Sequence, residues 1–276
     1  MFHGLGQHKE QWEPTLEKLF TLHSEGSNLP RLREAWALDW QSHGEAAVLN
    51  EEALKDDPKS APLDLWASAT AGFLKSDLVA GHKLVGVGYS SGTVGLSIIM
   101  VEPSMMDEET WNTSHEEIQP FFDMYANAVK RRRDVWASKE AALNYFMGRF
   151  PWNSWDPRIV AVFSEHALKP SQDKDGNACV VGKCIAIHEA CAFQVNLKNT
   201  WDAVEQLSKL SQLVPIHVVY GENVDLMPQV IRDCVIKRLG TAASITTIPD
   251  VGHTIMQERP DVVATTISKI LNHNQD

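Results

Sequence analysis

The Gly88–Gly92 pentapeptide, Gly-Tyr-Ser-Ser-Gly, constrains the fold more than any other segment, because it directly follows the apolar run Leu84–Val87. This order predicts a strand, then a turn so tight that both flanking positions must be glycine, then a helix that begins near Thr93. Such a turn, known as a nucleophile elbow, strains its central residue and lifts the hydroxyl above the edge of a sheet. The pattern therefore predicts that Ser90 is a nucleophile.

The remainder of residues 1–104 and 205–276 alternates between strand-like and helix-like patterns. Predicted strands cover Trp36–Trp40, Lys83–Val87, Ser97–Val101, Ile216–Tyr220 and Ser244–Ile248, and predicted helices cover Asp64–Leu78 and Val262–Leu271. Strands that alternate with helices form a mostly parallel sheet with helices on both faces. We therefore expect these two segments to form one α/β core.

Residues 105–204 differ from the core segments, because they are helical in pattern, acidic at their start and rich in aromatic side chains. The aromatic residues are Trp111, Phe121, Phe122, Tyr125, Trp136, Tyr145, Phe146, Phe150, Trp152 and Trp155. An insertion of this kind after a strand of the sheet predicts a helical lid. Its aromatic side chains either line an apolar substrate cleft or form the small core of the lid itself.

Composition limits the class of partner. The chain has 276 residues, of which 43% are hydrophobic, and its formal net charge is −11. This acidic balance argues against nucleic acid or an anionic membrane as the main partner. The four cysteines form no C-x-x-C pair, which favours buried free thiols over a zinc site. We expect neither a cofactor nor a metal, and the sequence leaves the oligomeric state open.

The expected location is intracellular, in the cytoplasm. The first residues lack the charged and apolar regions of a secretory signal. No apolar stretch of the sequence approaches the length of a membrane span.

A serine nucleophile needs a base and an oxyanion hole. His253 is the candidate base, because it follows the last predicted strand and Gly252 before it lets the loop bring the imidazole over the sheet edge. The candidate oxyanion hole consists of two backbone N–H groups, that of Leu5 in a His-Gly-Leu turn and that of Ser91.

Two carboxylates are candidates for the acid that orients the histidine. Glu102 ends the predicted strand Ser97–Val101, so it is expected at the same sheet edge as Ser90. Asp225 lies in the loop after Tyr220, one residue beyond the position where such an acid is commonest, and that position is Val224 here. The spacing favours Glu102 and keeps Asp225 as the alternative.

Two further patterns have simpler explanations. The basic run Lys130–Arg133 is typical of a solvated helix face. The Asp173–Gly176 segment resembles part of a calcium loop but lacks the full ligand spacing, so we interpret it as a turn of the lid.

The chain resembles fungal α/β-hydrolases, a group that includes the yeast peroxisomal lipase and acyl-CoA hydrolases of fungal secondary metabolism. The matching segments are His3-Gly4, Lys9-Glu10 with Trp12-Glu13-Pro14, Asp39 with His43-Gly44-Glu45-Ala46 and Asn50, Gly88–Gly92, Val101-Glu102-Pro103, Arg132-Arg133 with Trp136 and Ser138, Trp155-Asp156-Pro157-Arg158 and Gly252-His253. The resemblance implies an α/β-hydrolase fold with an inserted lid, and it implies Glu102 as the acid. The chain ends Asn274-Gln275-Asp276, which is not a peroxisomal signal of the Ser-Lys-Leu type, so a peroxisomal location does not carry over.

The chain departs from this group in two places. The group has several strands before the His-Gly turn, whereas this chain begins at the turn. Ser90 and Glu102 are also only twelve residues apart, and four residues between Gly92 and Ser97 cannot hold a full crossover helix between parallel strands. We therefore expect either a displaced Ser97–Val101 strand or a shortened chain whose amino-terminal strands are missing.

The sequence predicts a serine hydrolase that cleaves an ester or thioester through an acyl-enzyme intermediate. The expected substrate is a small molecule with an apolar acyl or aromatic group. Two alternatives stay open: a non-catalytic or truncated α/β-hydrolase-like binding module, and lyase or cyclase chemistry on a polyketide-like intermediate at the same elbow.

Overall fold

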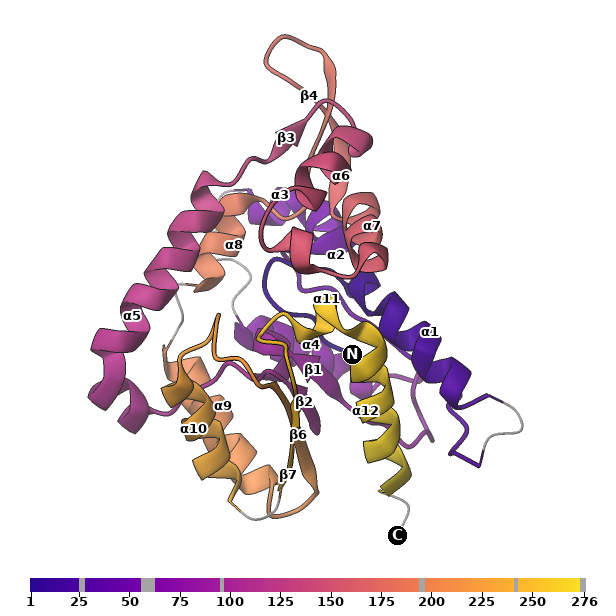
Figure 1. The fold of residues 1–276 in the computed structure, drawn as a ribbon, viewed down its shortest axis with the longest axis vertical. Helices are drawn as coiled ribbons and strands as arrows, with labels where there is room; N and C mark the ends of the chain where they lie inside the picture. The colour runs from indigo at the N-terminus through magenta and orange to yellow at the C-terminus, as the bar shows by residue number, and fades with distance from the viewer. Residues whose placement is uncertain (25–27, 56–62, 95–96, 194–196, 241–242, 274–276) are drawn as a thin grey trace.

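A four-stranded parallel sheet forms the centre of the molecule (Figure 1). The computed structural model describes residues 1–24, 28–55, 63–94, 97–193, 197–240 and 243–273. The strands are β1 (Val87–Tyr89), β2 (Ile99–Val101), β6 (Ile216–Gly221) and β7 (Ala243–Ile248). Their spatial order is β1-β2-β6-β7, and all neighbours are parallel. The predicted parallel sheet is therefore confirmed, and all four strands end at one edge.

Helices cover both faces of this sheet, as the alternating pattern predicts (Figure 1). The two pairs are α1 (Glu13–Leu22) with α12 (Pro260–His273), and α9 (Leu197–Leu210) with α10 (Gln229–Leu239). Along β2, Ile99 and Val101 join the core cluster of the first pair, whereas Met100 joins the cluster of the second. Burial on both faces explains why β2 is apolar at every position and why β6, apart from His217, is mainly apolar.

The edge of the sheet beside β1 is less regular than the sequence predicts. The predicted strand Trp36–Trp40 is reduced to one bridge, in which Leu38 pairs with Phe2, and Phe2 in turn pairs with Gly88. The predicted strand Lys83–Val87 also starts too early. Leu84 is 43% exposed and Val85 is 37% exposed, so the regular ladder begins only at Val87.

The connection between β1 and β2 contains no α-helix in its described part. The helix predicted from Thr93 is replaced by a short 3₁₀ helix, η2 (Ser90–Val94), and residues 95 and 96 lie outside the described residues. β2 nevertheless pairs with β1 on one side and with β6 on the other. The expectation of a displaced strand is therefore wrong, because a tighter turn brings the chain back within a shorter interval than a full helix needs.

Residues 107–193, which we call the insert, lie above the carboxyl edge of the sheet (Figure 1). The insert contains α5 (Glu108–Arg131), β3 (Val135–Trp136), α6 (Lys139–Met147), η3 (Trp152–Ser154), α7 (Pro157–His166), β4 (Leu168–Gln172), β5 (Ala178–Gly182) and α8 (Ala186–Phe193). The helical pattern predicts only part of it, because β3, β5 and β4 form an antiparallel sheet. Asp173–Gly176 lies between β4 and β5, at the predicted turn.

The insert has a core of its own, built from aromatic side chains. Trp136, Phe146, Trp152 and Phe163 are buried together there. The predicted lid ends at residue 204, in the middle of α9. Val204 and Leu207 of this helix pack with side chains of β6, so α9 belongs to the core and not to the insert.

The remaining helices surround the core. They are η1 (Lys9–Trp12), α2 (Gly44–Leu49), α3 (Glu51–Leu54), α4 (Leu63–Leu74) and α11 (Ile255–Glu258). None of the helices within the described ranges is both long enough and apolar enough to span a membrane.

Candidate active site

The elbow has the strained geometry that the sequence predicts. Ser90 adopts φ of +52°, in the left-handed region that side chains rarely occupy. A Cβ added at Gly88 would lie 2.6 Å from the Gly92 carbonyl oxygen, and one added at Gly92 would lie 2.5 Å from the carbonyl oxygens of Phe2 and His3. Both flanking positions therefore require glycine.

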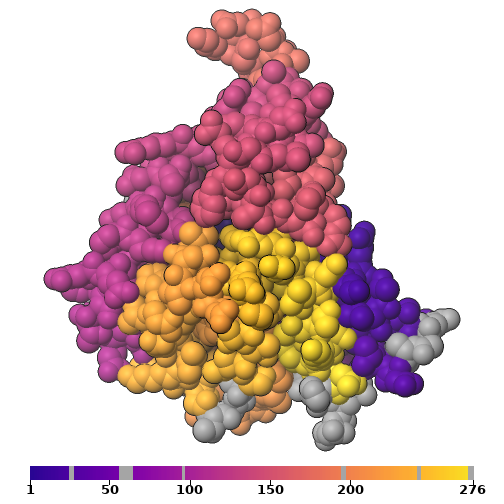
Figure 2. All heavy atoms as spheres, in the orientation of Figure 1, coloured from indigo at the N-terminus to yellow at the C-terminus, as the bar shows by residue number. Residues whose placement is uncertain are grey.

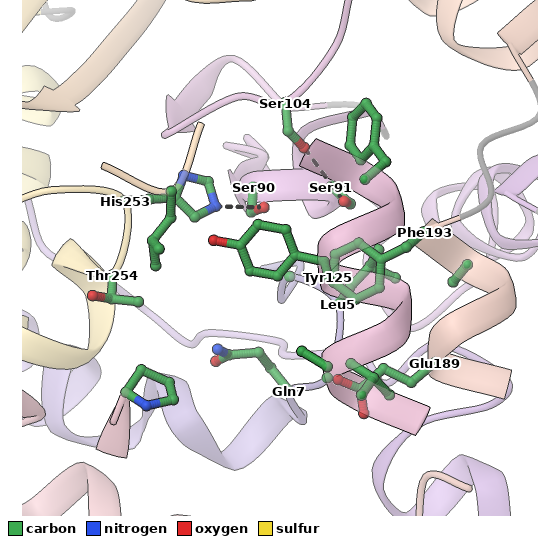
Figure 3. Close-up of a pocket in the computed structure, with 18 of the residues that line it drawn as sticks. Leu5, Gln7, Ser90, Ser91, Ser104, Tyr125, Glu189, Phe193, His253 and Thr254 are labelled. Carbon is green, nitrogen blue, oxygen red and sulfur yellow. Dashed lines mark hydrogen bonds between the residues drawn. The ribbon is translucent and has the colours of Figure 1, made fainter. Parts of the chain in front are cut away.

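Three side chains from three strand ends meet above the sheet. Ser90 follows β1, Glu102 follows β2, and His253 lies in the loop after β7. Ser90 Oγ is 3.0 Å from His253 Nε2 (Figure 3), and His253 Nδ1 is 3.1 Å from Glu102 Oε2. With the ring proton on Nδ1, the imidazole donates to the carboxylate and its Nε2 accepts the serine hydroxyl proton.

The alternative acid, Asp225, contacts the same loop at a different point. Its carboxylate accepts the backbone N–H of His253 at 2.9 Å and that of Leu226 at 2.5 Å. A Cβ at Gly252 would overlap this carboxylate, so glycine lets the loop pass close to it. Asp225 therefore holds the backbone of the histidine loop, while the imidazole turns to Glu102.

Glu102 is held from several directions. It is 1% exposed and has φ of +51°. Its Oε1 accepts the Gly221 N–H at 2.6 Å, and Arg232 Nη2 lies 3.1 Å from each carboxylate oxygen. Sequence reasoning missed Arg232, because a single arginine on α10 carries no signal that it reaches a carboxylate 130 residues away.

Tyr89 fixes the other side of the histidine loop. Its hydroxyl lies 3.0 Å from the His253 carbonyl oxygen and 3.1 Å from Gln257 Oε1, and its ring centre is 5.7 Å from that of His253. Burial raises the pKa of Tyr89 well above its usual value, so the hydroxyl stays a neutral donor.

The predicted oxyanion turn packs directly against Ser90. A Cβ at Gly4 would lie only 3.1 Å from Ser90 Cβ. Leu5 and Ser91 both line the cavity in front of Ser90 (Figure 3). Within the described residues the Leu5 N–H donates no hydrogen bond, so it stays available to a ligand.

Two neutral histidines support this turn. His3 Nδ1 donates to the Gly4 carbonyl oxygen at 2.8 Å, and His43 Nε2 accepts the Gly6 N–H at 3.1 Å. Burial lowers the pKa of His3 to about 4 and places that of His43 well below its usual value. Both rings are therefore neutral near pH 7, which matches the donor and acceptor roles they have here.

A cavity of about 1030 Å³ opens in front of Ser90 and His253. Its walls include aromatic side chains of the insert, namely Phe121, Phe122, Tyr125, Trp152, Phe163 and Phe193. Tyr125 and Phe193 stack with ring centres 5.6 Å apart. Figure 2 shows the insert, coloured magenta to salmon, seated on the orange and yellow segments of the core. The cavity thus lies between core and insert.

An ion pair between the buried Glu189 and the partly exposed Arg132 forms part of the cavity wall. Arg132 Nη2 lies 2.6 Å from Glu189 Oε2, and Arg132 Nη1 lies 3.2 Å from Glu189 Oε1. A Cβ at Gly6 would overlap the Glu189 carboxylate, so this pair also packs on the oxyanion turn. The interpretation of Lys130–Arg133 as a solvated face is therefore wrong for Arg132, whose partner lies far away in the sequence.

Comparison with known proteins identifies relatives of the whole chain. A family model described as "Alpha/beta hydrolase family" matches residues 1–266. No curated protein matches the chain by sequence.

Solved structures share the fold at low sequence identity. The peroxisomal alpha-beta-hydrolase Lpx1 from Saccharomyces cerevisiae has a TM-score of 0.69 and 18% identity, over 99% of this chain and 75% of that one. E-2-(acetamidomethylene)succinate hydrolase has a TM-score of 0.63 and 18% identity, over 97% and 88%. An esterase from Mycobacterium tuberculosis has a TM-score of 0.59 and 18% identity, over 98% and 83%. At this identity the likeness concerns the fold alone.

Proposed function

The chain belongs to the alpha/beta hydrolase family, and on this premise we propose that it is a serine hydrolase that cleaves an ester or thioester through an acyl-enzyme intermediate. The observation that carries the proposal is the continuous contact from Ser90 Oγ to His253 and on to Glu102, at the edge where the strands end.

The acylation step begins at Ser90. His253 Nε2 takes the hydroxyl proton as Oγ attacks the substrate carbonyl carbon, and Glu102 stabilises the imidazolium that forms. The tetrahedral intermediate carries its negative charge on the former carbonyl oxygen, and the N–H groups of Leu5 and Ser91 donate to it. When the intermediate collapses, the bond to the leaving group breaks and His253 gives its proton to the departing alcohol or thiol.

Deacylation repeats the same proton transfers with water. His253 takes a proton from water as the water oxygen attacks the acyl carbon of the Ser90 ester. Collapse of the second intermediate releases the carboxylic acid, and the proton returns to Ser90 Oγ. His3 and His43 contribute by holding the Gly4 carbonyl and the Gly6 N–H on either side of the Leu5 donor.

The cavity supports a substrate with an apolar acyl or aromatic group. Its aromatic walls come mainly from the insert, and burying apolar surface there favours binding by about 25 cal/mol per Å². We further propose that the insert is the lid predicted for residues 105–204. The intracellular location and the link to fungal secondary metabolism stay predictions.

A fluorophosphonate probe tests the proposed function. We expect the purified protein to be labelled at Ser90, and we expect it to hydrolyse p-nitrophenyl esters of short and medium acyl chains. The Ser90→Ala variant should show neither reaction. An acyl thioester assayed with a thiol reagent distinguishes thioester from ester cleavage. A protein that melts cooperatively yet shows no labelling and no turnover would contradict the proposal and support a non-catalytic binding module.

A further inference from the structure

Arg232 is a buried cation whose contacts converge on the proposed acid. It lies on α10 and is 5% exposed. Nη2 contacts both oxygens of Glu102, Nη1 donates to the Gly221 carbonyl oxygen at 2.8 Å, and Nη2 also lies 3.1 Å from the Asn223 carbonyl oxygen. Burying a charge is unfavourable unless it is paired, so a guanidinium at this depth calls for a specific role.

Few charged or titratable groups surround the Glu102 carboxylate. Arg232 faces it from α10, and His253 faces it from the loop after β7. The Tyr220 ring of β6 lies under the guanidinium, 5.0 Å from its carbon atom. The negative charge of Glu102 contributes to the raised pKa of Tyr220, after burial, and to that of Tyr89 on β1. Asp225 accepts the backbone N–H of His253 and therefore faces the backbone of the histidine loop.

We propose that Arg232 is a positioning residue of the triad, which aims Glu102 Oε2 at His253 and offsets part of the carboxylate charge. The inference rests on the proposed function. The geometry divides the carboxylate between its partners: Oε1 binds the Gly221 N–H and Arg232, and Oε2 binds Arg232 and His253 Nδ1. Because Arg232 also binds the Gly221 carbonyl oxygen, it links the acid to the end of β6.

Two consequences follow for the enzyme. Without the guanidinium, Glu102 loses the contact that fixes its rotation, and a misplaced catalytic group costs about 100-fold in rate. Its charge is also no longer offset, so it holds a proton on His253 more strongly. A protonated imidazole cannot accept the proton of Ser90, so the acidic limb of the pH profile moves up by about one pH unit.

The test compares Arg232→Met and Arg232→Lys with Arg238→Gln. Arg238 lies on the same helix, is partly exposed and pairs with Asp107 away from the triad, so it is the matched control. With a p-nitrophenyl ester we expect Arg232→Met to lower kcat about 100-fold with little change in KM, and to raise the acidic limb of kcat/KM by about one pH unit. Arg232→Lys should restore the acidic limb and only part of kcat, because lysine supplies the positive charge but not the several fixed N–H donors of the planar guanidinium. Arg238→Gln should leave both quantities unchanged.

Loss of fold is separated from loss of positioning in two ways. Rates are expressed per Ser90 that reacts with the fluorophosphonate probe, and a thermal melt accompanies each variant. The double variant Glu102→Gln/Arg232→Met removes both charges, so no unpaired carboxylate remains buried. If Arg232 acts through Glu102, adding Arg232→Met to Glu102→Gln lowers kcat no further.

Three results would overturn the inference: an unmoved acidic limb in Arg232→Met, the same loss of kcat in both backgrounds, or a melting shift with kinetics intact. A wild-type protein without Ser90-dependent turnover would instead refute the proposed function, and the inference with it. Turnover in the wild type together with any of the three results leaves the proposed function standing and removes only the role of Arg232.

Discussion

Glu102→Gln is the substitution that most directly tests which carboxylate orients His253. In the native protein Oε1 of Glu102 accepts the Gly221 N–H and Oε2 accepts from His253 Nδ1. In the variant, the Gly221 N–H still donates to the Oε1 position, whereas Arg232 Nη2 is equally close to both positions, so the amide oxygen takes the Oε1 position. The amide NH₂ group then faces Nδ1.

This orientation reverses the tautomer of the imidazole. An NH₂ group facing Nδ1 makes that nitrogen an acceptor, so the ring proton moves to Nε2. Nε2 can then no longer accept the proton of Ser90, which lies 3.0 Å away. We expect kcat to fall about 10⁴-fold, the size seen for the equivalent change in another serine-histidine-acid enzyme, which corresponds to about 5 kcal/mol of transition-state stabilisation.

The assay is steady-state hydrolysis of a p-nitrophenyl ester, with the rate of Ser90 labelling as a second readout and a thermal melt as the check on folding. Asp225→Asn is the matched control. Its side-chain oxygen can still accept the His253 N–H, so kcat should change less than about fivefold. The reasoning is refuted if Glu102→Gln keeps more than a tenth of the activity, or if Asp225→Asn loses more activity than Glu102→Gln.

Two further predictions concern stability. Gly92→Ala should lower the free energy of unfolding by about 2–3 kcal/mol in a denaturant titration and abolish Ser90 labelling, because its Cβ meets the carbonyl oxygens of Phe2 and His3 at 2.5 Å. Gly72→Ala, at a position with open space, is the control and should not destabilise. His3 has a pKa of about 4 when folded against 6.5 when unfolded, so the unfolded chain binds more protons between these values. The free energy of unfolding therefore falls as the pH drops from 6.5 toward 4, by about 3 kcal/mol in total, because protonation of His3 favours the unfolded chain. The His3→Gln variant should show a flatter dependence of stability on pH in this range.

Local patterns were sufficient to predict the elbow and most of the sheet. Gly88 is required by a contact with the Gly92 backbone four residues later, β6 and β7 follow from short runs rich in β-branched residues, and α12 follows from helical periodicity. These features depend on residues close together in the chain. Their hydrogen bonds and apolar faces can therefore be read from a short window of sequence.

The partners of Glu102 and Arg132 depend on the packing of distant segments. Glu102 and Asp225 both lie beyond strand ends near the histidine loop. The His253 side chain points toward Glu102, so Glu102 contacts the imidazole and Asp225 contacts the backbone N–H. Arg232 reaches Glu102 from α10, which packs on one face of the sheet, and Arg132, within a basic run, pairs with Glu189. The turn around Ser90 can thus be predicted from local sequence, although its Gly92 packs against the distant Phe2 and His3. The environment in which Ser90 acts is set by where the parallel strands and the insert bring buried charges together, since a buried charge must be paired wherever its partner lies in the chain.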